Sequence, residues 1–218
     1  MVEISTSLLN VKENFIKIFY NLEIAHTDYF HIDVMDGKFV ENNTLERMKD
    51  YVITIKQISN LPLDIHLMVE NVRKYVDEYI DFRPNIITFH IEAIKEKEEV
   101  YKIIKYIKEN GMKVGIAIKP DTKIEKIYEF LPYIHMVLIM TVEPGKGEQK
   151  LILETVKKVK KLKEYIDKEK IDIDIEVDGG INEETANLVK DAGSNILVVG
   201  SAIIKSKDYS DTIKKIRM

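Results

Sequence analysis

Short runs of β-branched residues alternate with longer stretches rich in Lys and Glu along the whole chain. Apolar residues recur at helical spacing in the longer stretches, whereas the short runs have the character of strands. Eight candidate strands follow, at residues 3–8, 29–34, 63–68, 86–91, 113–118, 136–141, 172–178 and 196–199. Amphipathic segments lie between and after them, such as residues 72–82, 98–110, 151–168, 183–192 and 208–216. This alternation predicts an α/β fold with a parallel sheet.

The number of strand–helix units selects among the α/β folds. Eight units in 218 residues average about 27 residues each, which suits a compact (β/α)8 TIM barrel, a fold of about 200 to 250 residues. A doubly wound parallel sheet is the alternative. The nine glycines and five prolines do not cluster, so no linker or second domain is indicated. We therefore predict a single (β/α)8 barrel domain over residues 1–218.

Charge and cysteine content exclude several classes of protein. The 33 basic and 37 acidic residues give a formal net charge of −4, without the basic stripe typical of nucleic-acid binding. The chain has no cysteine, so only His and carboxylate side chains can hold a metal. No apolar run approaches the ~18 to 20 residues of a membrane span, and the N-terminus lacks signal-peptide features. We expect a soluble, cytoplasmic protein that binds neither nucleic acid nor membrane.

Three candidate strands have polar C-terminal ends, where barrel enzymes carry their catalytic groups. The period of two of the second strand places His31 and Asp33 on one face. The third strand carries His66 in the same way, and the seventh ends at Asp178. Each histidine alone could be a buried hydrogen-bonding group. Two imidazoles and two carboxylates together favour a site for zinc, iron, manganese or cobalt.

Glycines follow the last three candidate strands. The loops after strands six, seven and eight carry Gly145 and Gly147, Gly179 and Gly180, and Gly200 with Ser201, respectively. Barrels commonly bind phosphate through these loops, where backbone amides meet the anion. A tight turn would explain any one of the glycines. The same feature in three successive loops favours a phosphate site.

Eight short motifs complete the pattern, namely residues 7–9 (SLL), 31–40 (HIDVMDGKFV), 64–68 (DIHLM), 90–93 (HIEA), 119–122 (KPDT), 140–145 (MTVEPG), 175–181 (IEVDGGI) and 199–202 (VGSA). As a set they resemble the ribulose-phosphate 3-epimerase family over the whole chain. The resemblance implies a barrel of the ribulose-phosphate-binding type. It also implies an isomerase that interconverts D-ribulose 5-phosphate and D-xylulose 5-phosphate, a step of the pentose phosphate pathway, by inverting C3.

The resemblance further implies one divalent metal ion per subunit, with zinc as the first expectation and iron, manganese or cobalt as alternatives. By this resemblance the metal ligands are His31, Asp33, His66 and Asp178. Asp33 and Asp178 are also the catalytic pair that transfers protons through a metal-stabilised enediolate. The chemistry agrees, because removing a proton next to a ketone needs a base and a group that stabilises the developing oxyanion.

The family pattern also implies a pocket for a sugar phosphate. Its substrate-binding residues are expected to be Ser7, Met35, His66, Met68, Met140, Gly145, Gly147, Gly179, Gly180, Gly200 and Ser201. Core packing is the alternative role for the methionines. Asp36 and Glu176 are expected to orient metal ligands. A homo-oligomer, either a dimer or a hexamer, is expected as well.

Two loops depart from the family pattern. The usual Gly-Phe-Gly-Gly-Gln after the sixth strand reads Gly-Lys-Gly-Glu-Gln over residues 145–149, and the usual Pro-Asn is replaced at residues 41–43. A carboxylate at Glu148 is unfavourable near a phosphate unless it turns outward as a helix cap, and Lys146 could compensate with its charge. Affinity or substrate choice can therefore differ.

Three other histidines stay outside the predicted site. His90 stands beside Glu92, where the matching family segment implies either a structural role or a role in supporting the metal ligands from outside, whereas His26 and His135 precede strands and are expected at the surface.

Three alternative functions remain open at this point. The nearest one keeps the mechanism and changes the substrate, as in allulose 6-phosphate 3-epimerase. In the second, Lys119 forms a Schiff base with a carbonyl substrate in a metal-free aldolase of the same fold. The third is a catalytically silent sugar-phosphate-binding protein, which the four intact ligand residues disfavour.

Overall fold

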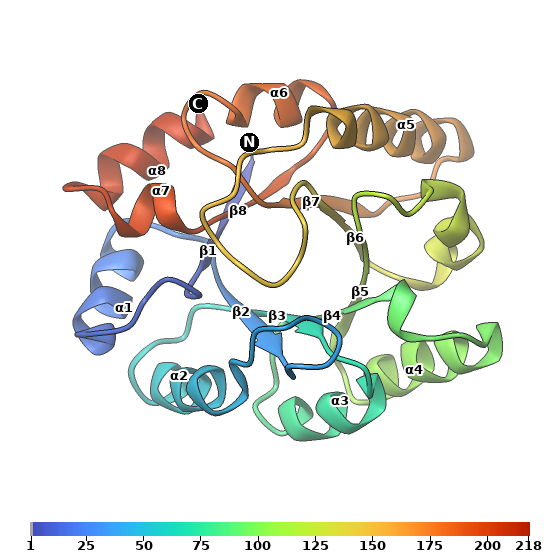
Figure 1. The fold of residues 1–218 in the computed structure, drawn as a ribbon, viewed down its shortest axis with the longest axis horizontal. Coiled ribbons are helices and arrows are strands. Elements are labelled where there is room, and N and C mark those ends of the chain that lie inside the picture. Colours follow the sequence, from blue (N-terminus) through green and yellow to red (C-terminus); the bar gives the residue numbers. More distant parts are fainter. Residues whose placement is uncertain (1) are drawn as a thin grey trace.

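The computed structural model describes residues 2–218 and confirms the predicted fold. Eight parallel strands form a closed barrel in sequence order, and the helices surround it (Figure 1). The strands are β1 (Glu3–Ser7), β2 (Tyr29–Met35), β3 (Leu63–Met68), β4 (Ile86–His90), β5 (Lys113–Ile118), β6 (Met136–Met140), β7 (Asp174–Asp178) and β8 (Ile196–Val199). The α-helices are α1 (Phe15–Ile24), α2 (Leu45–Ile58), α3 (Val72–Ile80), α4 (Lys97–Glu109), α5 (Leu153–Glu169), α6 (Ala186–Asp191), α7 (Ser201–Ile204) and α8 (Tyr209–Arg217).

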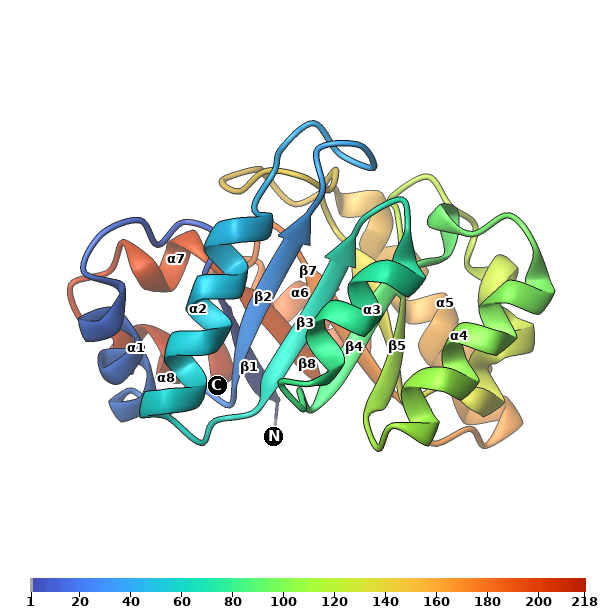
Figure 2. The same cartoon turned by 90° about the horizontal axis from the view of Figure 1, so that it is seen from below.

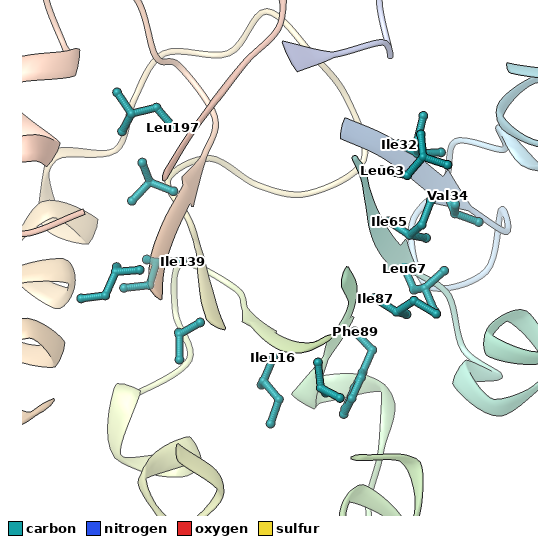
Figure 3. Close-up of a cluster of buried hydrophobic side chains, with 14 of the residues drawn as sticks. Ile32, Val34, Leu63, Ile65, Leu67, Ile87, Phe89, Ile116, Ile139 and Leu197 are labelled. Carbon is teal, nitrogen blue, oxygen red and sulfur yellow. The ribbon is translucent and has the colours of Figure 1, made fainter. Parts of the chain in front are cut away.

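The main hydrophobic core lies between the outer face of the barrel and the helices. Ile32 and Val34 of β2, and Ile65 and Leu67 of β3, are fully buried there and point away from the barrel axis (Figure 3). Because side chains alternate along a strand, the residues between them face the interior of the barrel. The outer face supplies the apolar burial, which leaves the inner face free to carry polar groups at one end.

Several element boundaries differ from the sequence-based expectation by a few residues. Helix α6 begins at Ala186 rather than at residue 183. Residues 183–185 form the turn that leads into it, and the side chain of Asn182 accepts hydrogen bonds from the backbone N–H groups of Glu184 and Thr185 in that turn. Strand β4 ends at His90, where the short 3-10 helix η1 (Ile91–Ala93) begins.

The connection after β5 is a long 3-10 helix, η2 (Ile124–Tyr133). It contains Pro132, which has no backbone N–H to donate within a helix. The segment nevertheless buries Ile127 and Phe130 against the barrel, as the α-helices of the other units do. Within residues 2–218, no helix combines the length and the apolar character needed to cross a membrane.

Two loops rise at the C-terminal ends of the strands. Residues 36–44, between β2 and α2, stand above the rim in Figure 2, and residues 141–152, between β6 and α5, cross the mouth of the barrel in Figure 1. Asp36 accepts hydrogen bonds from the backbone N–H groups of Lys38, Phe39 and Glu70. It therefore holds the first of these loops in place, which corrects the expectation that it orients a metal ligand.

Candidate metal centre and substrate pocket

The four predicted metal ligands come together at the C-terminal end of the barrel. His31 and Asp33 belong to β2, His66 to β3 and Asp178 to β7. One ligand atom of each lies within 4.8 Å of those of the other three. His31 Nε2 is 3.4 Å from a carboxylate oxygen of Asp33. His66 Nδ1 is 3.6 Å from carboxylate oxygens of both Asp33 and Asp178. We call these four residues the metal cluster.

Two nitrogen atoms test whether the metal cluster fits an ion. His31 Nε2 and His66 Nδ1 are buried, and within the described part of the chain neither has a hydrogen-bond partner. Buried polar atoms are nearly always paired, so a cation that accepts both lone pairs would account for them. Two imidazoles and two carboxylates are a donor set suited to zinc and similar divalent ions. The residues therefore fit a divalent metal.

The carboxylates of the metal cluster favour positive charge between them. Burial opposes a charge on His31, but Asp64 and Asp33 outweigh it and raise the pKa of the imidazole well above its ordinary value. Burial also opposes a charge on His66, yet Asp178 and Asp33 raise its pKa. Burial opposes ionisation of Asp33, but His31 and His66 bring the carboxyl pKa far below its ordinary value. A proton and a metal ion therefore compete for this site: a bound cation would contact the same carboxylate oxygens and would leave His31 Nε2 and His66 Nδ1 to offer lone pairs.

Asp64 lies beneath the metal cluster and orients His31. Its Oδ2 is 2.5 Å from His31 Nδ1 and accepts a hydrogen bond of 2.8 Å from the Ser5 hydroxyl. With Nδ1 donating to Asp64, the lone pair of His31 is on Nε2, toward the other ligands. Asp64 is not among the site residues predicted from the sequence, although its place two residues before His66 on the same strand face is a signal for it.

Glu176 is fully buried next to this pair. Together with His31 and Asp64 it forms a second set of groups that could reach one ion. Burial and the negative charge of Asp64 raise the pKa of the Glu176 carboxyl well above its ordinary value. A protonated carboxyl is a poor metal ligand, so the metal cluster above is the better site, and Glu176 lies beside the carboxylate that orients His31.

A cavity of about 330 Å³ opens above the metal cluster. It is lined by Asp33 and Asp178 and by these residues predicted to bind substrate: Ser7, Met35, Met68, Met140, Gly145, Gly147, Gly179, Gly180, Gly200 and Ser201. His66, which we also expected to contact substrate, is fully buried as a member of the metal cluster and is not among the described residues that line the cavity. Met140 both lines the cavity and packs inside the barrel against Leu138 and other apolar residues.

Glycine is required where two loops meet at one wall of the cavity. Gly179 and Gly180 have φ angles of 121° and 69°, which other residues rarely adopt. A Cβ atom at Gly179 would lie 2.3 Å from a methyl carbon of Val142, and one at Gly180 would lie 2.4 Å from the backbone nitrogen of Leu151. The loop after β7 can therefore approach residues 141–152 only as bare backbone.

Glu148, which departs from the family pattern, has an unusual backbone conformation and an ion-pair partner. Its φ of 62° is left-handed, a conformation that glycine adopts freely, and glycine is the residue of the family pattern there. Its carboxylate lies 2.6 Å from Nζ of Lys205 in an exposed ion pair. Glu148, Lys205 and Lys146 all line the cavity. Glu148 thus stays at the mouth, where Lys205 is its partner, and Ile152 rather than Glu148 precedes α5.

The other histidines differ in their surroundings. His26 is exposed, as expected. His135 is half-buried, and its Nδ1 accepts a hydrogen bond of 3.0 Å from the backbone N–H of Val114, so it lies at the surface only in part. His90 is fully buried, with Nε2 2.9 Å from His66 Nε2. Its position at the end of a strand on the inner face was the signal that links it to the site.

Lys119 does not place its amine in the cavity. Its Nζ lies 4.1 Å from the centre of the Phe39 ring, and the residues that line the cavity within the described chain do not include it. This placement disfavours a Schiff base between Lys119 and a substrate in the cavity.

Comparison with known proteins agrees with this geometry. A sequence model of the ribulose-phosphate 3 epimerase family matches residues 3–204. The ribulose-phosphate 3-epimerase of Bacillus subtilis (strain 168) is 40% identical over 198 residues, covering 90% of this chain and 89% of the relative. That of Methanocaldococcus jannaschii is 39% identical over 218 residues, covering 100% of this chain and 90% of the relative.

Solved structures show the same fold at low sequence identity. A crystal structure of KGPDC from Streptococcus mutans has a TM-score of 0.74 and 11% identity, covering 99% of this chain and 95% of that one. 3-Hexulose-6-phosphate synthase from Salmonella typhimurium has a TM-score of 0.67 and 16% identity, covering 99% and 96%. These similarities concern the barrel alone. The sequence matches over nearly the whole chain establish that the protein belongs to the ribulose-phosphate 3-epimerase family, a family of isomerases.

Proposed function

We propose that the protein inverts C3 of a ketose phosphate and interconverts D-ribulose 5-phosphate and D-xylulose 5-phosphate. The observation that carries this proposal is the convergence of the Asp33 and Asp178 carboxylates, from β2 and β7, at the floor of one cavity. Relatives named ribulose-phosphate 3-epimerase, similar over nearly their full length, support the choice of substrate.

Asp33 and Asp178 act as the acid–base pair in this proposal. They come from strands that are not neighbours in the barrel, so they can reach a substrate from two sides. One carboxylate removes the C3 proton, and the other, protonated, returns a proton to the opposite face. Their surroundings differ, because the Asp33 side chain is 4% exposed and accepts a 2.7 Å hydrogen bond from Ser7, whereas the Asp178 side chain is 16% exposed. Different surroundings are what two carboxyls in different protonation states require.

The metal cluster would hold one divalent ion, with zinc ahead of iron, manganese or cobalt. When bound, the ion supplies Lewis-acid stabilisation of the negative charge that develops on the substrate oxygen as the C3 proton leaves. Met35, Met68 and Met140 are nearly fully buried and give the cavity an apolar, polarizable wall. This wall excludes water from the carbon whose configuration changes.

The glycine loops would hold the phosphate at the other end of the cavity. At Gly179 and Gly180 the backbone has no side chain to separate it from the cavity wall. Gly200 and Ser201 line the same cavity. Backbone N–H groups in such loops suit a phosphate dianion. Lys205 adds a cation at the same mouth.

The test is C3 epimerisation of ribulose 5-phosphate and allulose 6-phosphate, compared side by side. The protein is stripped with a chelator and reloaded with zinc, iron, manganese or cobalt. We expect metal-dependent turnover that favours the pentose phosphate. A preference for the hexose phosphate would move the assignment to allulose 6-phosphate 3-epimerase. Lack of turnover with every metal would contradict the proposal, and borohydride trapping of substrate on Lys119 would favour the aldolase instead.

A further inference from the structure

A line of buried polar groups leads from the metal cluster to the next strand. His66 Nε2 lies 2.9 Å from His90 Nε2, and His90 Nδ1 lies 3.1 Å from Oε2 of Glu92. The other oxygen of Glu92 accepts a hydrogen bond of 2.9 Å from the backbone N–H of Lys119 and another from the Thr122 hydroxyl. The line therefore ends at a carboxylate that accepts hydrogen bonds from two donors in the loop after β5.

The donors and acceptors of this line have one consistent direction. A carboxylate only accepts, so His90 Nδ1 is the donor to Glu92. An imidazole whose single proton is on Nδ1 has its lone pair on Nε2, and two N–H groups cannot face each other across the 2.9 Å between the two Nε2 atoms. His90 Nε2 is therefore the acceptor, and His66 Nε2 donates to it. Nδ1 of His66, the atom that faces Asp33 and Asp178, is then the nitrogen that can offer a lone pair to a metal.

The loop between β2 and α2 covers His90, the middle member of this line. The Phe39 ring lies 4.9 Å from the His90 ring, centre to centre, and Lys119 Nζ lies 4.1 Å from the centre of the same Phe39 ring. His66 and His90 are both 0% exposed. Because both rings are buried, an N–H group that faces another N–H group has no alternative hydrogen-bond partner. Moving one of these protons to the other nitrogen of its ring is therefore costly in free energy.

We propose that His90 and Glu92 are positioning residues that keep the proton of His66 on Nε2 and so leave Nδ1 free to bind the divalent metal. The expected effect on metal binding rests on the proposed function. The position of the proton on His90 can be measured in the metal-free protein. In many metal sites a carboxylate accepts a hydrogen bond from the imidazole that binds the metal. In this protein a second histidine, His90, would lie between the imidazole of His66 and the carboxylate of Glu92.

Glu92→Gln tests the direction of the line at nearly constant shape. The backbone N–H of Lys119 requires an acceptor, so the amide oxygen of the new side chain stays there and its NH₂ group faces His90. His90 must then accept at Nδ1 and donate from Nε2. His66 in turn receives that hydrogen bond at Nε2 and carries its own proton on Nδ1, where the proton competes with the metal.

The first measurement is the dissociation constant for zinc and for cobalt, by competition with a chromophoric chelator. We expect Glu92→Gln to raise it about 10- to 100-fold, the usual effect of losing an outer partner of a metal-bound histidine. The matched control is Glu99→Gln, which neutralises an exposed carboxylate of α4 whose partner is Lys102. The control should bind both metals as the wild type does.

The second measurement is heteronuclear NMR of nitrogen-labelled histidines in the metal-free protein. We expect the single proton of His90 on Nδ1 in the wild type and in Glu99→Gln, and on Nε2 in Glu92→Gln. A wild-type proton on His90 Nε2, or unchanged metal affinity in a folded Glu92→Gln variant, would overturn the inference. A wild type that shows the expected proton but binds no metal would instead contradict the proposed function.

Discussion

Nδ1 of His31 lies 2.5 Å from Oδ2 of Asp64, and the two residues stand opposite each other in the register of β2 and β3. Asp64 also accepts a hydrogen bond from Ser5 of β1. Three adjacent strands thus meet at one carboxylate beneath the metal cluster. Each imidazole of the metal cluster has its own neighbour at the other ring nitrogen, Asp64 for His31 and His90 for His66.

Asp64→Asn is expected to weaken metal binding while the barrel stays folded. The amide keeps the shape of the side chain but has one neutral acceptor oxygen, whereas the carboxylate has two oxygens that share a negative charge. The hydrogen bond that orients His31 is therefore weaker. We expect the zinc dissociation constant to rise about 10- to 100-fold. Asp77→Asn, in an exposed pair with Arg73, is the control. Equal zinc affinity in the two variants would show that Asp64 does not orient the ligand.

Asp33→Asn and Asp178→Asn should each abolish epimerisation. An asparagine can neither remove nor return a proton at C3, and general acid–base groups contribute about 10²- to 10⁴-fold to rate. We expect kcat to fall by at least that factor with the circular dichroism spectrum unchanged. Bound metal must be quantified in each sample, because both residues are proposed ligands. Near-normal kcat in either variant would remove the mechanism with two carboxylates, and the exposed Asp191→Asn should behave as the wild type.

Gly180→Ala should impair binding of the sugar phosphate, whereas Gly111→Ala should not. Both glycines have positive φ angles, 69° and 83°, so each alanine costs about 1–2 kcal/mol of stability. Only at Gly180 would the new Cβ lie 2.4 Å from the backbone of Leu151 and displace the loop that covers the cavity. Because small displacements in a site are costly, we expect KM to rise at least about tenfold. Steady-state kinetics that give equal KM values for the two variants would contradict the phosphate site.

The parts of the fold that depend on local pattern could be predicted from the sequence. Ile32 and Val34 alternate with His31 and Asp33, so one strand shows both its apolar outer face and its polar inner face. The start of α6 could not be placed in this way. The helical pattern begins at residue 183, and it does not show that residues 183–185 form a turn, bonded to the Asn182 side chain, before the regular helix begins.

The convergence of the four residues of the metal cluster could be predicted from the sequence, but the contacts that orient them could not. His31, Asp33, His66 and Asp178 stand at strand ends, which the fold alone brings to one rim. The pairing of His66 with His90 depends on the register and tilt of β3 against β4, and neither strand contains that information by itself. The pairing of Glu148 with Lys205 likewise depends on how two loops close over the mouth.

Glu148→Gln should improve binding of the sugar phosphate. The change removes a negative charge from the cavity mouth and frees Lys205 from its ion pair. Both side chains are more than half exposed, and exposed pairs contribute about 0.2–1 kcal/mol, so we expect KM to fall about two- to fivefold with little change in stability. The gain should shrink at high salt. Glu183→Gln, in an exposed pair with Lys215, is the control, and an unchanged or higher KM in Glu148→Gln would contradict a phosphate at this end of the cavity.

Glu92 should also make the stability of the metal-free protein depend on acid pH. Burial opposes its charge, but His90, Thr122 and the backbone N–H of Lys119 outweigh burial and lower the carboxyl pKa to about 2, from 4.5 in the unfolded chain. The unfolded chain therefore binds this proton first as the pH falls, so the stabilisation is complete above about pH 4.5 and is lost toward about pH 2. Glu92→Gln lacks this dependence. We expect the Tm difference between wild type and Glu92→Gln to be largest near neutral pH and to shrink through that window, whereas a difference that stays constant would show that the folded protein does not hold Glu92 as a carboxylate.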